Sequence, residues 1–307
     1  MYEPKKFKAS YSARYDADTP TVSMRKLGPV AMAAETTGFV NLVEPNVPGI
    51  KDRLRQLHDP EYVDAFIAGR APLAESQGWR WTPEIRDGVL AIQEGQLAAA
   101  AIALKEGLAA NVAQGFHHAT YECGGGFCTF NGLALVAQEY PDRIIFVLDC
   151  DEHAGDGTEN FVNRLGNLHQ STIHGASYGC STIERSACFS FREPVTHNWT
   201  AYESALLRSF ELIKDCGADL VIYQAGADPH INDPLGSLGM TTEQMEKRDR
   251  MVFKFLLREE IPTLFVLAGG YQEPIREKLV PLHLNTFAAA SSEYNLPKHQ
   301  GNGGRRG

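Results

Sequence analysis

The chain of 307 residues has no apolar stretch long enough to span a bilayer, which requires roughly 20 consecutive apolar residues. It also has no secretion-signal pattern, because residues 1–8 lead into polar sequence rather than an apolar segment. These absences argue against a helical membrane protein and predict a cytoplasmic protein that binds no membrane. With 43% hydrophobic residues, the chain can bury one large core.

Cysteines in the C-x-x-C spacing are also absent, although the chain contains six cysteines. In a chain of this length without an export signal, we expect reduced thiols rather than a disulfide framework or a zinc knuckle. Excess positive charge is lacking as well. The net charge of −9 argues against a nucleic-acid surface and is compatible with a cationic substrate or partner.

No internal repeat or linker divides the sequence, which predicts one domain over residues 1–297 and a frayed, glycine-rich tail over 298–307. Residues 10–48 show little periodicity and are expected to form loops and a short strand over the core. Helices are expected at 83–105, 131–139, 201–215 and 242–259, and strands at 144–148, 220–224 and 263–267. This alternation is typical of an α/β fold with a parallel sheet covered by helices.

The first of these strands leads into a cluster of carboxylates and an imidazole, with the sequence DCDEHAGDG over residues 149–157. In an extended segment, successive side chains alternate between faces, so Asp149, Asp151 and His153 would point the same way. Functional sites in open α/β sheets form at the carboxyl ends of strands. The segment is therefore a candidate metal site.

The other two strands also end in residues suited to chemistry. Asp228 follows the second strand and Tyr271 follows the third. The pair His117-His118 precedes the glycine-rich loop 124–126, which lacks the Lys-Ser/Thr of a phosphate cradle. Because the carboxyl ends of parallel strands share one edge of the sheet, we expect these residues to converge there.

Together these residues supply the parts of a metal-dependent hydrolase. Asp151, His153 and Asp228 would be three protein ligands, which leaves an open position for water and a substrate oxygen, as in a catalytic zinc site. The pair His117-His118 offers a base for that water and an acid for the leaving group. Tyr271 offers a hydroxyl that can donate to the developing oxyanion.

The motifs resemble those of the zinc-dependent histone deacetylases and their bacterial relatives, within the arginase/deacetylase superfamily. The resemblance extends from about His58 to Tyr271 and leans toward the class IV branch through residues 247–249 and 270–272. It implies an open three-layer α/β fold, with a central, mainly parallel sheet, that forms the catalytic domain. It is carried by His117-His118, Gly126-Phe127-Cys128, 149–157, Ala225-Gly226-Ala227-Asp228 followed by Asp233-Pro234-Leu235-Gly236, and Gly269-Gly270-Tyr271.

The resemblance also implies roles for individual residues. His118 would be the general base and then the general acid, hydrogen-bonded to Asp156. His117 would be an electrostatic partner oriented by Asp149. The sequence Gly126-Phe127 would line an acyl-lysine tunnel.

Two cations are implied in the same way. The catalytic metal would be Zn²⁺, and Fe²⁺ accepts the same Asp/His/Asp ligands. Family members also bind a structural monovalent cation, here expected to be K⁺. Its implied ligands are the Asp149 side chain and the carbonyls of Asp151 and His153, with Thr172 as a candidate for the next.

The chain departs from the family at two positions inside the metal motif. The family usually has His or Gln where Ala154 stands, and an apolar or small residue where Glu152 stands. Neither position is an expected ligand. The metal site is therefore expected to survive, with altered local packing and substrate preference.

Three functions remain open. The first is a zinc-dependent deacylase that acts on an acylated amine such as acyl-lysine or an acetylpolyamine. The second is an arginase-like binuclear manganese hydrolase. Residues 228–230 argue against it, because they lack the Asp-x-Asp spacing that would bind two metals. The third is an inactive module that binds acylated ligands, which would not need both histidines and Tyr271. The acyl length, the amine carrier and the oligomeric state are left open.

Overall fold

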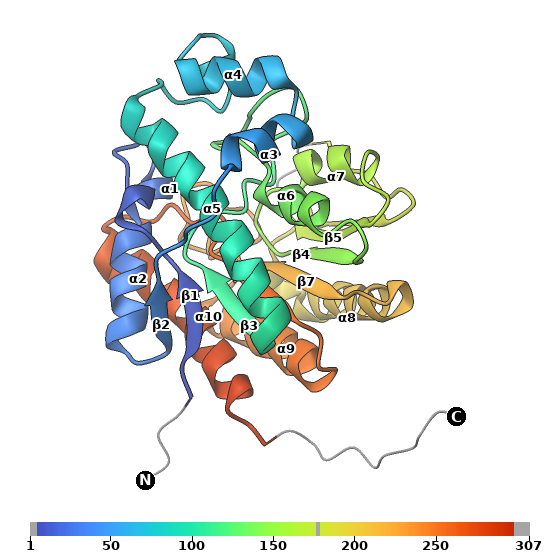
Figure 1. The fold of residues 1–307 in the computed structure, drawn as a ribbon. Coiled ribbons are helices and arrows are strands. Elements are labelled where there is room, and N and C mark those ends of the chain that lie inside the picture. The colour runs from blue at the N-terminus through green and yellow to red at the C-terminus, as the bar shows by residue number, and fades with distance from the viewer. Residues whose placement is uncertain (1–4, 176–178, 298–307) are drawn as a thin grey trace.

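A computed structural model describes residues 5–175 and 179–297, and the predicted tail at 298–307 lies outside the described residues (Figure 1). Its centre is one sheet of eight parallel strands in the order β2-β1-β3-β8-β7-β4-β5-β6. The strands are β1 Phe7–Ser10, β2 Val40–Val43, β3 Leu108–Asn111, β4 Ile145–Asp149, β5 Leu168–His174, β6 Ser186–Ser190, β7 Leu220–Gln224 and β8 Thr263–Val266.

Helices cover both faces of the sheet (Figure 1). The long helix α5 packs across β1, β3 and β8, while α10 packs against α9 and α2. Within the described residues, no helix combines the length and apolarity needed to cross a membrane. The helices are α1 Val22–Arg25, α2 Leu27–Thr36, α3 Ile50–Leu57, α4 Pro60–Ala68, α5 Pro83–Glu106, α6 Gly132–Glu139, α7 Asp156–Val162, α8 Trp199–Cys216, α9 Thr242–Arg258 and α10 Val280–Tyr294.

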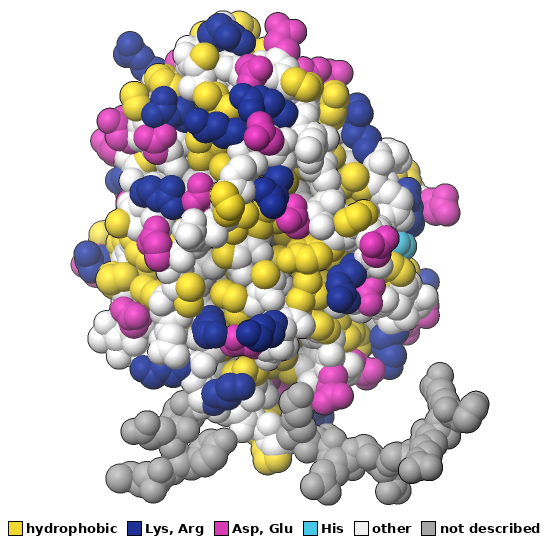
Figure 2. Space-filling model, viewed as in Figure 1, with side chains coloured by type: hydrophobic (Ala, Val, Ile, Leu, Met, Phe, Trp, Pro, Cys, Tyr) yellow, Lys and Arg dark blue, Asp and Glu magenta, His cyan; other side chains and the backbone are white. Residues whose placement is uncertain are grey.

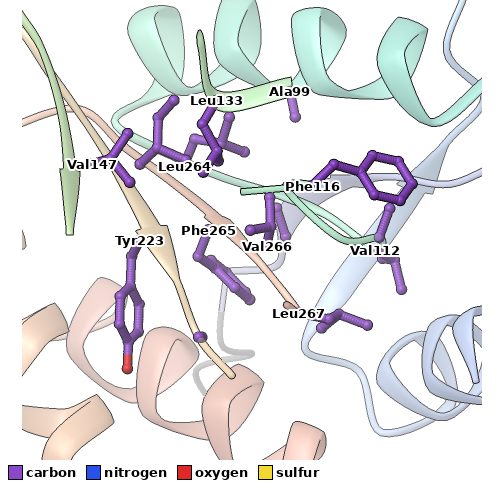
Figure 3. Packing of buried hydrophobic residues seen from close by; sticks show 14 of the residues in the cluster. Ala99, Val112, Phe116, Leu133, Val147, Tyr223, Leu264, Phe265, Val266 and Leu267 are labelled. Carbon is purple, nitrogen blue, oxygen red and sulfur yellow. The ribbon is translucent and has the colours of Figure 1, made fainter. Parts of the chain in front are cut away.

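The strand order explains why distant motifs converge. Strands β3, β8, β7 and β4 are neighbours in the sheet, so the segments that follow them leave the same edge. Their buried side chains form part of the core, where Leu264 and Phe265 of β8 lie between Tyr223 of β7 and the segment after β3 (Figure 3). The predicted open α/β fold with a parallel sheet is confirmed.

The expectation for residues 10–48 was wrong in part. The segment contains the expected loops and a short strand, β2, which pairs with β1 at the edge of the sheet, but it also contains the helices α1 and α2. Periodicity did not show α2 because its sequence is small and alanine-rich, with Gly28 and Pro29 in its first turn. Gly28 is required there, since a Cβ would lie 2.4 Å from the Asp16 carboxylate.

A buried ion pair between Arg248 and Asp249 lies beneath the ends of β4 and β7, and Arg248 holds these two strand ends together. The guanidinium of Arg248, on α9, lies 2.8 Å from the Asp249 carboxylate, and neither side chain is exposed. Arg248 Nη1 donates to the carbonyl oxygens of Cys150 and Gly226 at 3.1 and 2.9 Å. Because these two residues follow β4 and β7, one side chain fixes both metal-motif segments relative to α9.

Candidate metal centre and catalytic site

The three predicted metal ligands lie together at the carboxyl ends of β4 and β7. One ligand atom from each of Asp151, His153 and Asp228 lies within 4.8 Å of the other two. His153 Nδ1 is 3.3 Å from Asp151 Oδ1 and 3.4 Å from Asp228 Oδ2. Among the described residues, the buried Asp228 Oδ2 makes no hydrogen bond of good geometry, and its polar neighbour is His153 Nδ1 at 3.4 Å. A buried carboxylate oxygen of this kind fits a divalent cation as its partner.

The backbone around the ligands is shaped to approach them closely. A Cβ at Gly269 would lie 1.9 Å from Asp228 Oδ2, so only glycine fits beside this carboxylate. The N–H of Gly269 donates to Asp151 Oδ2 at 2.7 Å, and the N–H of His153 donates to Asp151 Oδ1 at 3.0 Å. These bonds orient the Asp151 carboxylate before any cation binds.

The pKa values of the candidate ligands are shifted because several carboxylates are buried close together. Burial and the nearby charge of Asp151 raise the pKa of Asp228 to about 7. Burial opposes charging of His153, but hydrogen bonds and charges from Asp151 and Asp228 outweigh it and raise its pKa to about 11. A site that favours positive charge this strongly suits a bound metal ion.

The tandem histidines each contact a different carboxylate. His117 Nδ1 lies 2.7 Å from Asp149 Oδ2, and His118 Nδ1 lies 2.6 Å from Asp156 Oδ1. Because an ionised carboxylate only accepts hydrogen bonds, both Nδ1 atoms carry the proton. The Nε2 atom of each ring makes no contact with these two carboxylates, and His117 Nε2 lies 3.7 Å from Asp151 Oδ1.

The two histidines differ sharply in basicity. Burial lowers the pKa of His117, but the charges of Asp149 and Asp151 outweigh it and raise the pKa to about 9. For His118, burial and then the charge of His117 lower the pKa to about 4, against the opposing pull of Asp156. The nearby carboxylates thus favour the charged form of His117, while burial and the charge of His117 favour the neutral form of His118.

Tyr271 lies across the pocket from these histidines. Its N–H donates to Asp233 Oδ2 at 2.8 Å, and its ring centroid is 6.0 Å from that of Phe127. Burial raises its pKa well above the ordinary value, with further contributions from the charges of Asp228 and Asp151. The hydroxyl therefore stays protonated and can donate to an oxyanion.

The predicted tunnel residues line a narrow pocket together with His117, Asp151 and Tyr271. The ring of Phe127 stacks on buried Trp79 with centroids 5.7 Å apart and planes 6° from parallel. Gly126 has a φ of 50°, and a Cβ there would lie 2.4 Å from the ring of His118. The lining consists of Ser23, Gln114, Gly115, Phe116, His117, Gly126, Phe127, Cys128, Asp151, Gln224, Ala268, Gly269 and Tyr271.

Strained backbone surrounds this cavity. Phe116, Phe127 and Ala268 have φ values of 60°, 64° and 53°, a region that residues other than glycine rarely adopt. Phe116 precedes the tandem histidines, and Ala268 precedes the loop that carries Tyr271. Such strain persists only where the surrounding structure enforces it, and it is common at functional sites.

Sequence reasoning missed Lys26, which follows α1 and is fully buried behind the Tyr271 loop. Its Nζ donates to the carbonyl oxygens of Ala268 and Gly269 at 2.7 and 2.9 Å. Burial lowers its pKa to about 8, while the charges of Asp228, Asp151 and Asp233 favour the charged form. No local pattern marks this lysine, because its partners lie more than 240 residues away.

It also missed two polar residues at the inner wall of the cavity. The side-chain amide of Gln114 donates to the Ser23 carbonyl oxygen. The Oε1 atoms of Gln114 and Gln224 are buried without a hydrogen-bond partner among the described residues. A glutamine beside a strand end is not a distinctive sequence signal, so only their placement identifies them.

The structure explains one departure from the family and places the candidate cation ligand. Glu152 is buried and accepts hydrogen bonds from Ser237 Oγ at 2.6 Å and Leu238 N at 3.0 Å, so it ties the metal motif to a neighbouring loop. Thr172 lies opposite Asp149 in the β4–β5 pairing. Its Oγ1 accepts a hydrogen bond from Gly155 N at 3.3 Å.

Comparison with known proteins identifies the family of the chain. The histone deacetylase domain model matches residues 23–287. An uncharacterized protein of Picosynechococcus sp. is 32% identical over 80% of this chain and 85% of its own length. Histone deacetylase 2 of Arabidopsis thaliana is 30% identical over 58% of this chain, and acetylpolyamine amidohydrolase 2 of Pseudomonas aeruginosa is 26% identical over 50%. The match spans 48% of the length of each of these last two relatives.

The fold is similar to that of a solved enzyme. The crystal structure of an acetylpolyamine aminohydrolase from Burkholderia pseudomallei superposes with a TM-score of 0.79 and 17% sequence identity. The superposition covers 94% of this chain and 99% of the other. At this identity, the likeness bears on the fold alone.

Proposed function

Because this chain belongs to the histone deacetylase domain family, we propose that it is a zinc-dependent deacylase that hydrolyses the amide bond of an acylated amine. The observation that carries this proposal is the placement of two carboxylate-supported histidines beside three candidate metal-ligand side chains. The Nδ1 atoms of His117 and His118 face Asp149 and Asp156, which leaves the Nε2 atom of each ring available for acid–base chemistry. A module that only binds acylated ligands would need neither.

The proposed chemistry divides among the residues of the pocket. Asp151, His153 and Asp228 would hold the metal, which when bound acidifies water and polarises the substrate carbonyl. His118 takes the proton from the attacking water and then gives it to the departing amine. The Tyr271 hydroxyl donates to the oxygen on which negative charge develops.

The carboxylate partners complete these roles. Asp156 fixes the tautomer of His118, so that Nε2 is free to accept a proton. Asp149 keeps His117 protonated, and the resulting positive charge favours negative charge in the transition state. Asp149 and Thr172, neighbours in the sheet, are also proposed to contribute to a K⁺ site that supports the end of β4.

The substrate we propose is an acyl-lysine or an acetylpolyamine. Two of the three named relatives are a histone deacetylase and an acetylpolyamine amidohydrolase, and both kinds of substrate would present an acyl chain on an alkylamine. Phe127, stacked on Trp79, supplies an apolar wall for that chain. Zinc is the proposed metal, with ferrous iron as the second candidate, because both accept this ligand set.

The test is turnover of fluorogenic acyl-lysines from acetyl to long-chain and of acetylated polyamines, on zinc-loaded and iron-loaded protein. A hydroxamate should abolish turnover because it chelates a metal in this type of site. Tyr271→Phe protein with full metal content is the matched control. Turnover that resists both the hydroxamate and a chelator would refute the proposal, as would silence over the whole panel with metal bound.

A further inference from the structure

Two cysteines lie close together outside the metal centre: Cys180 in the segment that joins β5 to β6, and Cys188 within β6. Cys180 and Cys188 are eight residues apart, and Cys188 Sγ donates to the Cys180 carbonyl oxygen at 3.5 Å. Both residues are partly exposed, and neither cysteine is in a disulfide. The Thr182 hydroxyl accepts a hydrogen bond from Cys188 N at 3.1 Å and holds the intervening turn against β6.

Each thiol has a different polar neighbour. His174 Nε2 lies 3.1 Å from Cys188 Sγ. Cys180 Sγ donates to Glu159 Oε2 at 2.9 Å. The four side chains form a row, His174, Cys188, Cys180 and Glu159, rather than a cluster around one point, and no metal-ligand group is found among them. This arrangement suits transfer between neighbouring thiols better than a second metal site.

From this geometry, we propose that Cys180 and Cys188 are a redox-modification site, at which a hydroperoxide converts the two thiols into a disulfide. Cys188 is the attacking thiol and Cys180 the resolving thiol. The contact with Cys180 and the ring of His174 lower the pKa of Cys188 to about 5, while the same contact, burial and the charge of Glu159 raise the pKa of Cys180. This asymmetry is typical of a reactive thiol beside its resolving partner.

The reaction balances in two steps. The Cys188 thiolate, which has lost its proton to solvent, attacks the hydroperoxide; the O–O bond breaks, one oxygen stays on sulfur as sulfenic acid, and the other leaves as hydroxide or alkoxide and takes a proton from water. The Cys180 sulfur then attacks Cys188, and its proton passes through the Glu159 carboxylate to the departing sulfenic hydroxyl, which leaves as water. Two thiols are oxidised and one hydroperoxide is reduced. The Cys180–Glu159 hydrogen bond is lost in the product.

The site connects to the catalytic pocket through α7. Glu159 is on this helix, which begins at Asp156, the hydrogen-bond partner of His118. Gln170 Nε2 is 3.9 Å from Cys180 Sγ and also donates to the carbonyl oxygen of Gly155 at 3.2 Å. Oxidation of Cys180 would therefore change its hydrogen bond to Glu159 and its contact with Gln170. Both of these residues contact or belong to the segment that holds Asp156.

The test is to treat the full chain with hydrogen peroxide and map its cysteines by differential alkylation and mass spectrometry. We expect Cys180 and Cys188 to become joined in one cross-linked peptide pair, reversibly with dithiothreitol, while Cys123 and Cys216 stay alkylatable. Recovery of both thiols unmodified, or prior oxidation of the two control cysteines, would overturn the proposal. This experiment uses the wild-type protein and needs no variant.

Two variants then separate the roles of the thiols. Cys180→Ser should stop Cys188 at the sulfenic acid, which dimedone traps, and Cys188→Ser should give no dimedone adduct at either position. Cys216→Ser, which changes a partly exposed cysteine at the end of α8, should behave as the wild type. A dimedone adduct on Cys180 in the Cys188→Ser protein would overturn the assignment of the attacking thiol.

Discussion

The ammonium group of Lys26 lies 2.9 Å from the carbonyl oxygen of Gly269, the residue whose N–H also donates to the carboxylate of Asp151, a proposed metal ligand. Lys26, near the start of the chain, is thus bonded to the loop that carries Tyr271. Through Gly269, the same loop is hydrogen-bonded to Asp151 in the metal motif. Lys26 is a positioning residue, because it contacts the backbone of this loop and acts on the reaction through it.

Lys26→Met should lower kcat on the order of 10- to 100-fold, since displacement of a reacting group by about 1 Å has effects of this size. Metal content should be retained, because none of the three ligands is changed. Steady-state kinetics with metal analysis checks this result. Lys51→Met, on an exposed part of α3, is the matched control. Unchanged kcat in the Lys26 variant would contradict a positioning role.

Asp228→Ala or Asp151→Ala should remove bound metal and activity together, because each change leaves only two protein ligands. Metal is measured by mass spectrometry on purified protein after dialysis. Asp142→Ala changes an exposed carboxylate and should keep full stoichiometry. A ligand variant that still holds one metal ion per chain would refute the assignment of that residue.

Tyr271→Phe should keep the metal and lower kcat by about 10²- to 10³-fold, the usual effect of losing one oxyanion donor. KM should change little, because the hydroxyl acts mainly in the transition state. A rate close to that of the wild type would reject the role of the hydroxyl.

His118→Ala should lower kcat by roughly 10²- to 10⁴-fold through loss of the general base. Asp156→Asn should lower it less, about 10- to 100-fold, because His118 remains but its tautomer is no longer fixed. His197→Ala, at an exposed histidine away from the pocket, serves as the control. If Asp156→Asn proved the more damaging change, Asp156 rather than His118 would be the principal proton acceptor.

His58 should make the fold sensitive to acid. Burial lowers its pKa from 6.5 to about 4, and its ring bridges Thr120 O at 2.8 Å and Asn131 N at 3.1 Å as a neutral imidazole. Between these pH values the unfolded chain binds more protons than the folded one. The contribution is therefore complete above pH 6.5 and is lost as the pH falls toward 4, by about 3 kcal/mol.

Urea unfolding of the wild type and His58→Gln at a series of pH values measures this effect. Glutamine does not titrate, so the stability difference between the two proteins should shrink as the pH falls from 6.5 to 4. Other ionisable groups are common to both proteins and cancel in the difference. A difference that is independent of pH would show that His58 is not the titrating group.

The arrangement of side chains on the surface is harder to predict from the sequence than the residues of the site. On the face drawn in Figure 2, Lys and Arg side chains are interspersed with Asp and Glu. The large hydrophobic side chains described as exposed include Ile231 and Leu235, both in the segment between Asp228 and α9. Neither position stands out in the sequence, because composition does not report where an element will face.

The α/β class, the long helices and the spacing of the candidate ligands could be predicted from the amino-acid sequence, because they depend on local periodicity and on short-range spacing. Asp151 and His153 are two residues apart, just beyond the end of β4 at Asp149, so they are close in the chain before any tertiary contact forms. The element boundaries also followed closely, since α5 begins at the predicted Pro83 after the N-cap Thr82.

Only the tertiary structure decided which distant residues support the site. Lys26, Gln114 and Arg248 act through backbone groups or cavity walls contributed by other elements, and such contacts leave no pattern in the nearby sequence. Likewise, α2 and β2 are held by packing at the sheet edge rather than by strong periodicity. The difference in basicity between His117 and His118 arises from burial and from charges far along the chain, so it exists only in the folded protein.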